Sequence, residues 1–147
     1  MGDAAERTVE VAAPADTLFD VIVDFEAYPE FLADLGIQYN RVISQSDTAA
    51  EVESQVKTMG FTEKYTLRYT LERPKRVAWE LVQGKLTKAN NGSWEIEPLD
   101  EGRCRAQYKI AASFGWMVPK ALVKKGIQSQ LPKMLDAFKR RAEQKAG

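Results

Sequence analysis

The segment FTEKYTLRYTL, from Phe61 to Leu71, places apolar and polar side chains alternately along the chain. Tyr65 and Tyr69 belong to the apolar set, and Lys64 and Arg68 lie in the polar set between them. A period of two is typical of a β-strand, because successive side chains point to opposite faces of a sheet. The segment therefore predicts a strand with one dry face and one wet face.

The same period extends on both sides of this segment, over about 75 residues from Ile37 onward. Short polar turns separate the runs, at residues 45–47, at Gly60 and at residues 100–102. We expect strands over residues 7–12, 37–44, 49–58, 61–71, 77–84, 86–99 and 103–112. Strands joined by such short turns form an antiparallel meander.

The period changes to that of a helix near both ends of the chain. Pro14 opens a first short helix, with Phe19 and Ile22 on its apolar face, and a second is predicted over residues 26–35, interrupted near Pro29. A long helix is predicted over residues 118–145, and at about 1.5 Å per residue it spans roughly 42 Å. Its apolar stripe consists of Leu122, Ile127, Leu131, Leu135 and Phe138. Pro132, inside this helix, is expected to kink or locally open it.

These elements predict one α+β domain covering residues 1–147. A strongly twisted antiparallel sheet of six or seven strands curls, and the long C-terminal helix is the element able to cover its apolar face. Two short helices after the first strand complete the fold. A curled sheet around one helix leaves space between them, and such pockets are mostly apolar with a few polar groups. The sequence therefore predicts a cavity suited to a hydrophobic small molecule.

The composition excludes several classes of chemistry. Basic and acidic residues number 21 each, so the zero net charge makes no general argument for nucleic-acid binding. There is no histidine, and Cys104 is the one cysteine. Nucleophilic catalysis by Ser-His or Cys-His pairs and ordinary zinc sites are therefore excluded, and we expect neither a metal nor another cofactor. Cys104 falls on the apolar face of its strand and is expected to be a small core residue rather than a nucleophile.

The N-terminal residues predict a cytoplasmic protein. Residues 1–6 are acidic and lack the basic start and apolar run of a secretory signal. No stretch approaches 18 uninterrupted apolar residues, the length that a membrane-spanning helix needs. A single cysteine also suits a reducing compartment.

Residues 21–32, VIVDFEAYPEFL, form a recognisable block in a helical context. VAAPAD at residues 11–16, Gly84 followed ten residues later by Trp94, and MLDAF at residues 134–138 complete the pattern. The chain resembles the polyketide cyclase/dehydrase and coenzyme Q-binding protein families of the START-like helix-grip (SRPBCC) superfamily. The resemblance covers almost the whole chain, and it implies a helix-grip fold with a hydrophobic ligand.

Side chains on the apolar faces of the expected sheet and helix are the candidates for ligand binding. They are Tyr65, Tyr69, Trp79, Trp94 and Tyr108 on the sheet, and Leu122 and Ile127 on the helix. Such a set either lines a cavity or fills the core, because Tyr and Trp can bury a ring while one polar atom stays bonded. Tyr28, Phe31 and Trp116 are candidates for a lid, and Tyr28 and Phe31 alternatively plug the core.

No catalytic residue is assigned, and three side chains remain candidates. Glu63 has the apolar parity of its strand, where a carboxylate could orient a ligand hydroxyl, although the nearby turn at Gly60 favours a structural role. Arg41 shares a face with Tyr39 and could hold a ligand oxygen or an anion. Tyr65 is the third candidate.

The charges are segregated along the chain. Residues 118–147 hold eight basic and two acidic residues, whereas residues 1–35 hold nine acidic residues and one basic residue. The basic helix is either an ordinary solvated face or a contact with a membrane surface, since Trp116 and Met117 precede it. Members of the superfamily described as ribosome-association toxins add a third interpretation. No RNA-binding motif with interleaved aromatic residues is present, so the sequence does not favour nucleic acid or the ribosome as a partner.

Three functions follow, in order of preference. The first is a non-catalytic carrier or sensor for a lipid, an isoprenoid quinone or a polyketide-like aromatic molecule. The second is an enzyme similar to the aromatase/cyclases, because positioning together with Tyr, Arg or Glu can assist aldol closure and dehydration. The absence of histidine removes the usual base and favours binding over catalysis. The third is a ribosome-associated, toxin-like module.

Overall fold

Seven strands form one antiparallel sheet in the structure, a computed structural model that describes residues 3–58 and 60–147. The strand order is β1-β7-β6-β5-β4-β3-β2, so β2 to β7 form a meander and β1 adds beside β7. The strands are β1 (Asp3–Val11), β2 (Ile37–Gln45), β3 (Ala49–Thr58), β4 (Phe61–Glu72), β5 (Arg76–Gly84), β6 (Thr87–Asp100) and β7 (Arg103–Phe114). The sequence-based prediction of a curled antiparallel sheet is confirmed.

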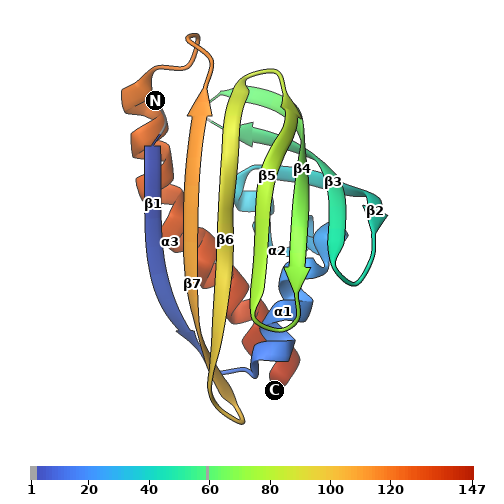
Figure 1. The fold of residues 1–147 in the computed structure, drawn as a ribbon. Helices are drawn as coiled ribbons and strands as arrows, with labels where there is room; N and C mark the ends of the chain where they lie inside the picture. The colour runs from blue at the N-terminus through green and yellow to red at the C-terminus, as the bar shows by residue number, and fades with distance from the viewer. Residues whose placement is uncertain (1–2, 59) are drawn as a thin grey trace.

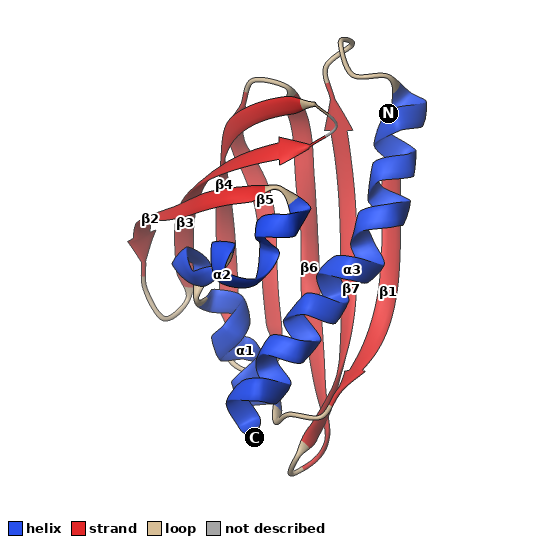
Figure 2. Ribbon diagram, turned by 180° about the vertical axis from the view of Figure 1, so that it is seen from behind, coloured by secondary structure: helices blue, strands red, loops and turns tan. Residues whose placement is uncertain are grey.

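The helices cover one face of this sheet. They are α1 (Ala15–Val23), η1 (Phe25–Ala27), α2 (Pro29–Leu32), η2 (Ala33–Leu35) and α3 (Lys120–Ala146). The sheet curls around α3, which runs along its concave side from one end to the other (Figure 1). Seen from behind, α3 crosses the sheet obliquely, with α1 near its C-terminal end and α2 beside its middle (Figure 2). In the described part of the chain, no helix is long and apolar enough to cross a membrane.

Two local expectations need correction. The first strand begins at Asp3 rather than Arg7, because it pairs with β7 along its full length. The expected helix over residues 26–35 is divided into the short turns η1, α2 and η2, and Gly36 ends the last of them with a φ of 95°. The long helix continues through Pro132, so it does not open there, and the expected kink stays a prediction. The carbonyl that lacks a partner there belongs to the exposed Gln128, so water can bond to it.

The core fills only one end of the space under the sheet. The α1 side chains Leu18, Phe19 and Ile22 are fully buried there. They belong to the same buried cluster as Leu135 and Phe138 from the second half of α3. The first half of α3 contributes smaller or polar residues on the side that faces the sheet, so that end is packed less completely.

The indole of Trp79 lies across Gly92, its partner on the neighbouring strand. A β-carbon at Gly92 would lie 2.6 Å from Cζ2 of Trp79 and 2.1 Å from the carbonyl oxygen of Lys109. Both distances are far inside van der Waals contact. A glycine is therefore needed at this point for Trp79 to turn toward the interior of the molecule.

We predict that Gly92→Ala destabilises the protein by about 3 kcal/mol, because the added methyl group displaces either Trp79 or the β7 backbone. Urea unfolding followed by circular dichroism measures the difference. Gly102→Ala is the matched control, since the nearest atom to its β-carbon is a carboxylate oxygen 4.0 Å away. Equal stability of the two variants would contradict this account of Trp79.

Candidate functional site

A cavity of about 260 Å³ lies between the concave face of the sheet and the part of α3 from Val123 to Phe138. Its walls come from the sheet, from α3 and from the segment that joins α1 to β2. Tyr65, Tyr69, Trp79, Trp94 and Tyr108, the five aromatic residues singled out on the sheet, all line it. The volume is close to the lower end of the roughly 300–1,000 Å³ usual for small-molecule sites.

The aromatic rings of the wall form a continuous row across the sheet. The rings of Tyr69 and Trp79 are 6.1 Å apart, and those of Trp79 and Tyr108 are 5.4 Å apart. The row continues from Tyr108 to Trp94 at 4.9 Å and from Trp94 to Phe138 of α3 at 5.1 Å. Tilted and edge-on contacts at these distances stabilise aromatic pairs by about 0.5–1.5 kcal/mol each. The rings therefore support one another around the space instead of collapsing into it.

The face of α3 that lines the cavity differs partly from the expected one. Ile127 lines the cavity as predicted, but Leu122 is 37% exposed and does not line it. Val123 takes that place with 5% exposure. The spacing explains the difference, because Val123, Ile127 and Leu131 recur every four residues and Leu122 is rotated by about 100° from Val123.

Polar groups that the sequence analysis missed also face the cavity: Asn40, Ser54, Asn90 and Gln130. The Asn40 amide donates a 2.9 Å hydrogen bond to the Phe25 carbonyl and accepts one of 2.6 Å from the Ser54 hydroxyl. Asn90 accepts a 3.0 Å bond from the indole nitrogen of Trp79. Asn40, Ser54 and Asn90 reach the inner face through the register of β2, β3 and β6, whereas Gln130 comes from α3. None of the described residues that line the cavity is charged.

Three phenolic hydroxyls, those of Tyr65, Tyr69 and Tyr108, add hydrogen-bonding capacity. None of the described residues forms a hydrogen bond with these hydroxyls. Among the described residues, every fully buried polar side-chain atom has a hydrogen-bond partner. The three hydroxyls are therefore not fully buried, and they keep contact with the cavity. Burial raises the pKa of Tyr65 to about 12, with a smaller contribution from the nearby Glu63 carboxylate. Burial likewise raises the pKa values of Tyr69 and Tyr108. All three are therefore neutral hydrogen-bonding groups at physiological pH.

Glu63 is buried, and its carboxylate already forms hydrogen bonds within the fold. Its carboxylate accepts bonds from the backbone N–H groups of Leu86 and Thr87, at 2.6 and 2.8 Å, and from the Thr87 hydroxyl at 2.6 Å. The β5–β6 ladder ends at the pair Trp79 and Gly92, so these bonds fasten the following turn to β4. These hydrogen bonds give Glu63 a structural role, as its closeness to a turn indicated. Glu63 does not line the cavity.

Arg41 lies outside the cavity, contrary to the expectation that it could hold a ligand group. Its side chain is 65% exposed and pairs with Glu53 at 3.3 Å. Tyr39 donates to the same carboxylate at 3.0 Å, so both side chains lie on the outer face of β2. Asn40, between them, points inward. The alternation of β2 therefore places Asn40 on the inner face of the sheet and Arg41 on the outer face.

The three lid candidates do not come together. The Tyr28 hydroxyl donates a 2.6 Å bond to the Ile22 carbonyl, and its ring lines the cavity as part of a fixed wall. Phe31 packs edge-on against Phe138 at 5.1 Å and does not line the cavity. Trp116 is 93% exposed and lies at the start of the segment leading into α3. The side chains therefore give Tyr28 and Phe31 a packing role, separate from Trp116.

Cys104 is fully buried on β7, and burial raises its pKa to about 11. A thiol in this state is a poor nucleophile. Among the described residues, no group of three or more His, Cys, Asp or Glu side chains is arranged to hold a metal ion.

An antiparallel sheet curled around one long helix, with a cavity between them, is the START-like helix-grip architecture. The model of the family described as polyketide cyclase / dehydrase and lipid transport matches residues 11–139. The chain belongs to this family. The expected resemblance and fold are thereby confirmed.

Known proteins that are similar to this chain have names that describe different functions. A ribosome association toxin RatA from Vibrio cholerae serotype O1 is 28% identical over 141 residues, which is 96% of each chain. The Zhui aromatase/cyclase from Streptomyces sp. R1128 superposes with a TM-score of 0.87 at 18% identity, over 100% of this chain and 97% of that one. A START superfamily protein from Mycobacterium smegmatis gives 0.82 at 23% identity, over 96% and 97%. At these identities the two solved structures establish the fold.

We predict that Glu63→Ala lowers the free energy of unfolding by about 2–4 kcal/mol, because two backbone N–H groups lose their acceptor. Glu63→Gln loses less than half as much, since its amide oxygen can still accept from Leu86 and Thr87. Chemical unfolding of both variants, with the exposed Glu80→Ala as control, measures this. A Glu63→Ala protein as stable as the control would contradict the structural role.

The raised pKa of Tyr65 makes stability depend on alkaline pH. A phenol in the unfolded chain titrates near pH 10, whereas Tyr65 in the folded protein titrates near 12. The unfolded chain therefore releases this proton first, and stability falls as the pH rises above about 10. We predict that Tyr65→Phe reduces that slope by up to about 1.4 kcal/mol per pH unit. Unfolding at pH 9, 10 and 11 tests it, and identical slopes would contradict it.

Proposed function

We propose that this protein binds an uncharged, largely apolar small molecule in the cavity and acts as a carrier or sensor rather than as an enzyme. The composition of the wall supports this most directly: aromatic and aliphatic side chains surround a few neutral polar groups. A charged ligand would lose its hydration without gaining a partner of opposite charge, which is costly. An apolar molecule with one or two oxygen atoms fits the wall.

The neutral polar groups favour a ligand with separated oxygen atoms. Asn40 and Ser54 lie on β2 and β3, whereas Asn90 and Tyr108 lie on β6 and β7. A lipid, an isoprenoid quinone or a polyketide-like aromatic molecule could use such groups, and the cavity suits a compact ring or part of a longer chain. A ligand burying about 300 Å² of apolar surface gains about 7.5 kcal/mol before the costs of binding.

The wall supports binding more than cyclase chemistry. Closing a polyketide ring needs a group that removes a proton, and the buried Glu63 carboxylate already accepts three hydrogen bonds within the fold. Tyr65 has a pKa of about 12 and is a donor rather than a base at neutral pH. The similarity to the Zhui aromatase/cyclase, at 18% identity, supports the shared fold.

Solvent extraction followed by mass spectrometry is the direct test of the proposal. We expect the purified protein to release an apolar molecule in near-stoichiometric amount. The fluorescent probe N-phenyl-1-naphthylamine should bind the extracted protein and be displaced by that molecule. A protein that is reproducibly empty, and that binds neither the probe nor any quinone, fatty acid or polycyclic aromatic, would overturn the proposal.

A pair of substitutions on α3 tests the location of the site. We predict that Ile127→Trp weakens binding of the probe at least tenfold, because the indole occupies the cavity. Leu122→Trp should leave binding unchanged, since Leu122 is exposed and does not line the cavity. Fluorescence titration measures both, with unfolding curves showing that each variant is folded. Equal loss in the two variants would place the probe elsewhere.

A second candidate function is ribosome association, favoured by the names of the curated relatives. The Vibrio cholerae relative covers 96% of this chain, so the whole domain is comparable. Co-sedimentation of the purified protein with ribosomal particles at increasing salt tests this function. Salt-dependent binding with an empty cavity would favour it over the carrier function.

A further inference from the structure

Three large apolar side chains are exposed together where β7 leads into α3. Trp116 is 93% exposed, Met117 is 58% exposed and Leu122 is 37% exposed. We call these three residues the apolar tip. The backbone beneath it is held in place, because Val118 is buried and donates a 3.0 Å hydrogen bond to the Gly115 carbonyl. The turn is therefore ordered, and the apolar tip on it faces outward.

Five exposed lysines lie on the segments that adjoin the apolar tip. This lysine cluster consists of Lys85, Lys88, Lys120, Lys124 and Lys125. Lys85 lies in the β5–β6 turn and Lys88 at the start of β6, and the Gly115 N–H donates a 2.7 Å bond to the Leu86 carbonyl of that turn. The turn and the start of α3 lie at the same end of the molecule (Figure 1). Residues 81–94 and 102–135 contain no Asp or Glu, so these segments offer the lysines no counter-charge.

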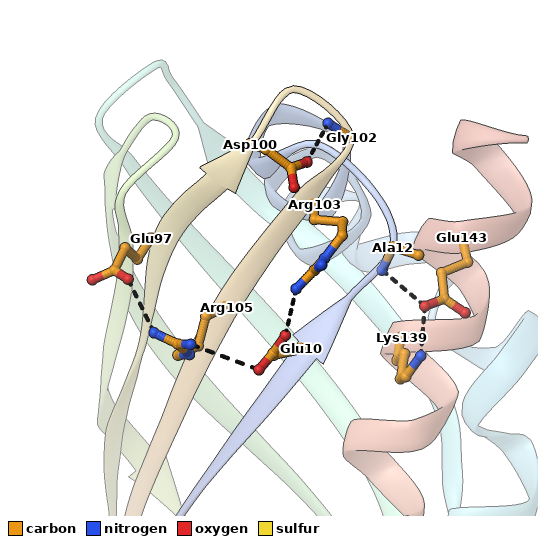
Figure 3. Close-up of polar contacts among 9 residues, drawn as sticks. All are labelled: Glu10, Ala12, Glu97, Asp100, Gly102, Arg103, Arg105, Lys139 and Glu143. Carbon is orange, nitrogen blue, oxygen red and sulfur yellow. Dashed lines mark hydrogen bonds and ion pairs between the residues drawn. The ribbon is translucent and has the colours of Figure 1, made fainter.

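At the opposite end of the molecule, several charged side chains pair with one another. Arg103 pairs with Glu10 at 2.7 Å, and Arg105 lies between Glu10 and Glu97 (Figure 3). Glu143 accepts from both Lys139 and the Ala12 backbone, which holds the pKa of Glu143 below its usual value. Within the described residues, by contrast, no member of the lysine cluster forms an ion pair. The segments next to the tip therefore carry five cations that have no ion-pair partner among the described residues.

The same contrast divides α3. Arg140 pairs with Asp136 at 2.8 Å, and Arg141 pairs with Glu30 at 2.7 Å. Several basic residues of its last turns are thus paired within the fold. Only the first turns of α3 present unpaired cations beside exposed apolar side chains.

We propose that the apolar tip and the lysine cluster together form a docking surface for an anionic membrane. An indole prefers the headgroup region of a bilayer, Met and Leu side chains insert below it, and lysines attract acidic headgroups. Two features favour a bilayer over RNA. The side chains of Met117 and Leu122 carry no aromatic ring on which an RNA base could stack. The lysine cluster contains no arginine, the residue best suited to bidentate contact with phosphates.

Docking in this way would place one end of the cavity near the membrane. Phe114, Val123 and Ile127 line the cavity within a few residues of the tip. Membrane docking itself does not depend on the proposed ligand. Its use, the exchange of an apolar molecule between bilayer and cavity, rests on the proposed carrier function.

Vesicle flotation tests the docking surface with the whole protein. We expect binding to vesicles of phosphatidylcholine with about 30% phosphatidylserine and at least tenfold weaker binding to phosphatidylcholine alone. Lys124→Glu/Lys125→Glu should weaken binding at least tenfold, and Trp116→Ala/Met117→Ala at least fivefold. Lys133→Glu/Lys145→Glu is the matched control, because it changes the net charge equally at exposed positions away from the tip.

The outcomes separate docking from the carrier function. Binding of N-phenyl-1-naphthylamine without vesicles should be the same in all these variants, so a loss of vesicle binding reports on docking alone. Absence of binding to anionic vesicles, or equal weakening in the control, would overturn the proposal. Salt-dependent binding to ribosomal particles that requires Lys124 and Lys125, without vesicle binding, would assign the surface to RNA instead.

Discussion

The contact between the Trp79 indole and the backbone at Gly92 determines the shape of the interior. Because Gly92 has no side chain, the indole lies against β6 and reaches Asn90 with its nitrogen. In that position it joins the rings of Tyr69 and Tyr108 into one wall. The β5–β6 ladder ends at the same pair of residues, and Glu63 fastens the turn beyond it. The wall of the cavity, the end of the ladder and the buried carboxylate are thus parts of one arrangement.

The two ends of the molecule differ in how completely the interior is packed and in whether the charged side chains form ion pairs. At the α1 end, large side chains fill the core and ion pairs tie β1 to the β6–β7 hairpin, while Glu143 of α3 accepts a hydrogen bond from the Ala12 backbone. At the other end, Gly126 and Gln130 of α3 leave space under the sheet, and the neighbouring lysines form no ion pair with the residues that the structure describes. The stable end allows the fold to tolerate an incompletely filled cavity and an exposed Trp116 at the other.

Much of the fold could be predicted from the sequence because its strands alternate so regularly. The segment from Phe61 to Leu71 and the five inward-facing aromatic residues follow directly from a period of two. The helix faces were less predictable, because the apolar stripe of α3 contains Leu122 and Val123 side by side and only packing selects Val123. Glu63 and Arg41 have apolar parity by sequence. One nevertheless bonds to a turn 23 residues away, and the other pairs across the outer face of the sheet.

The sequence by itself determined the class of fold, the aromatic inner face and the absence of imidazole chemistry, because these depend on local periodicity and composition. Only the tertiary structure decided which polar groups reach the cavity and which cations stay free. Asn40, Ser54 and Asn90 come from separate strands, and their meeting depends on strand register and sheet curvature. The lysines of the β5–β6 turn and of α3 are more than 30 residues apart, and they become one surface because β7 ends beside that turn.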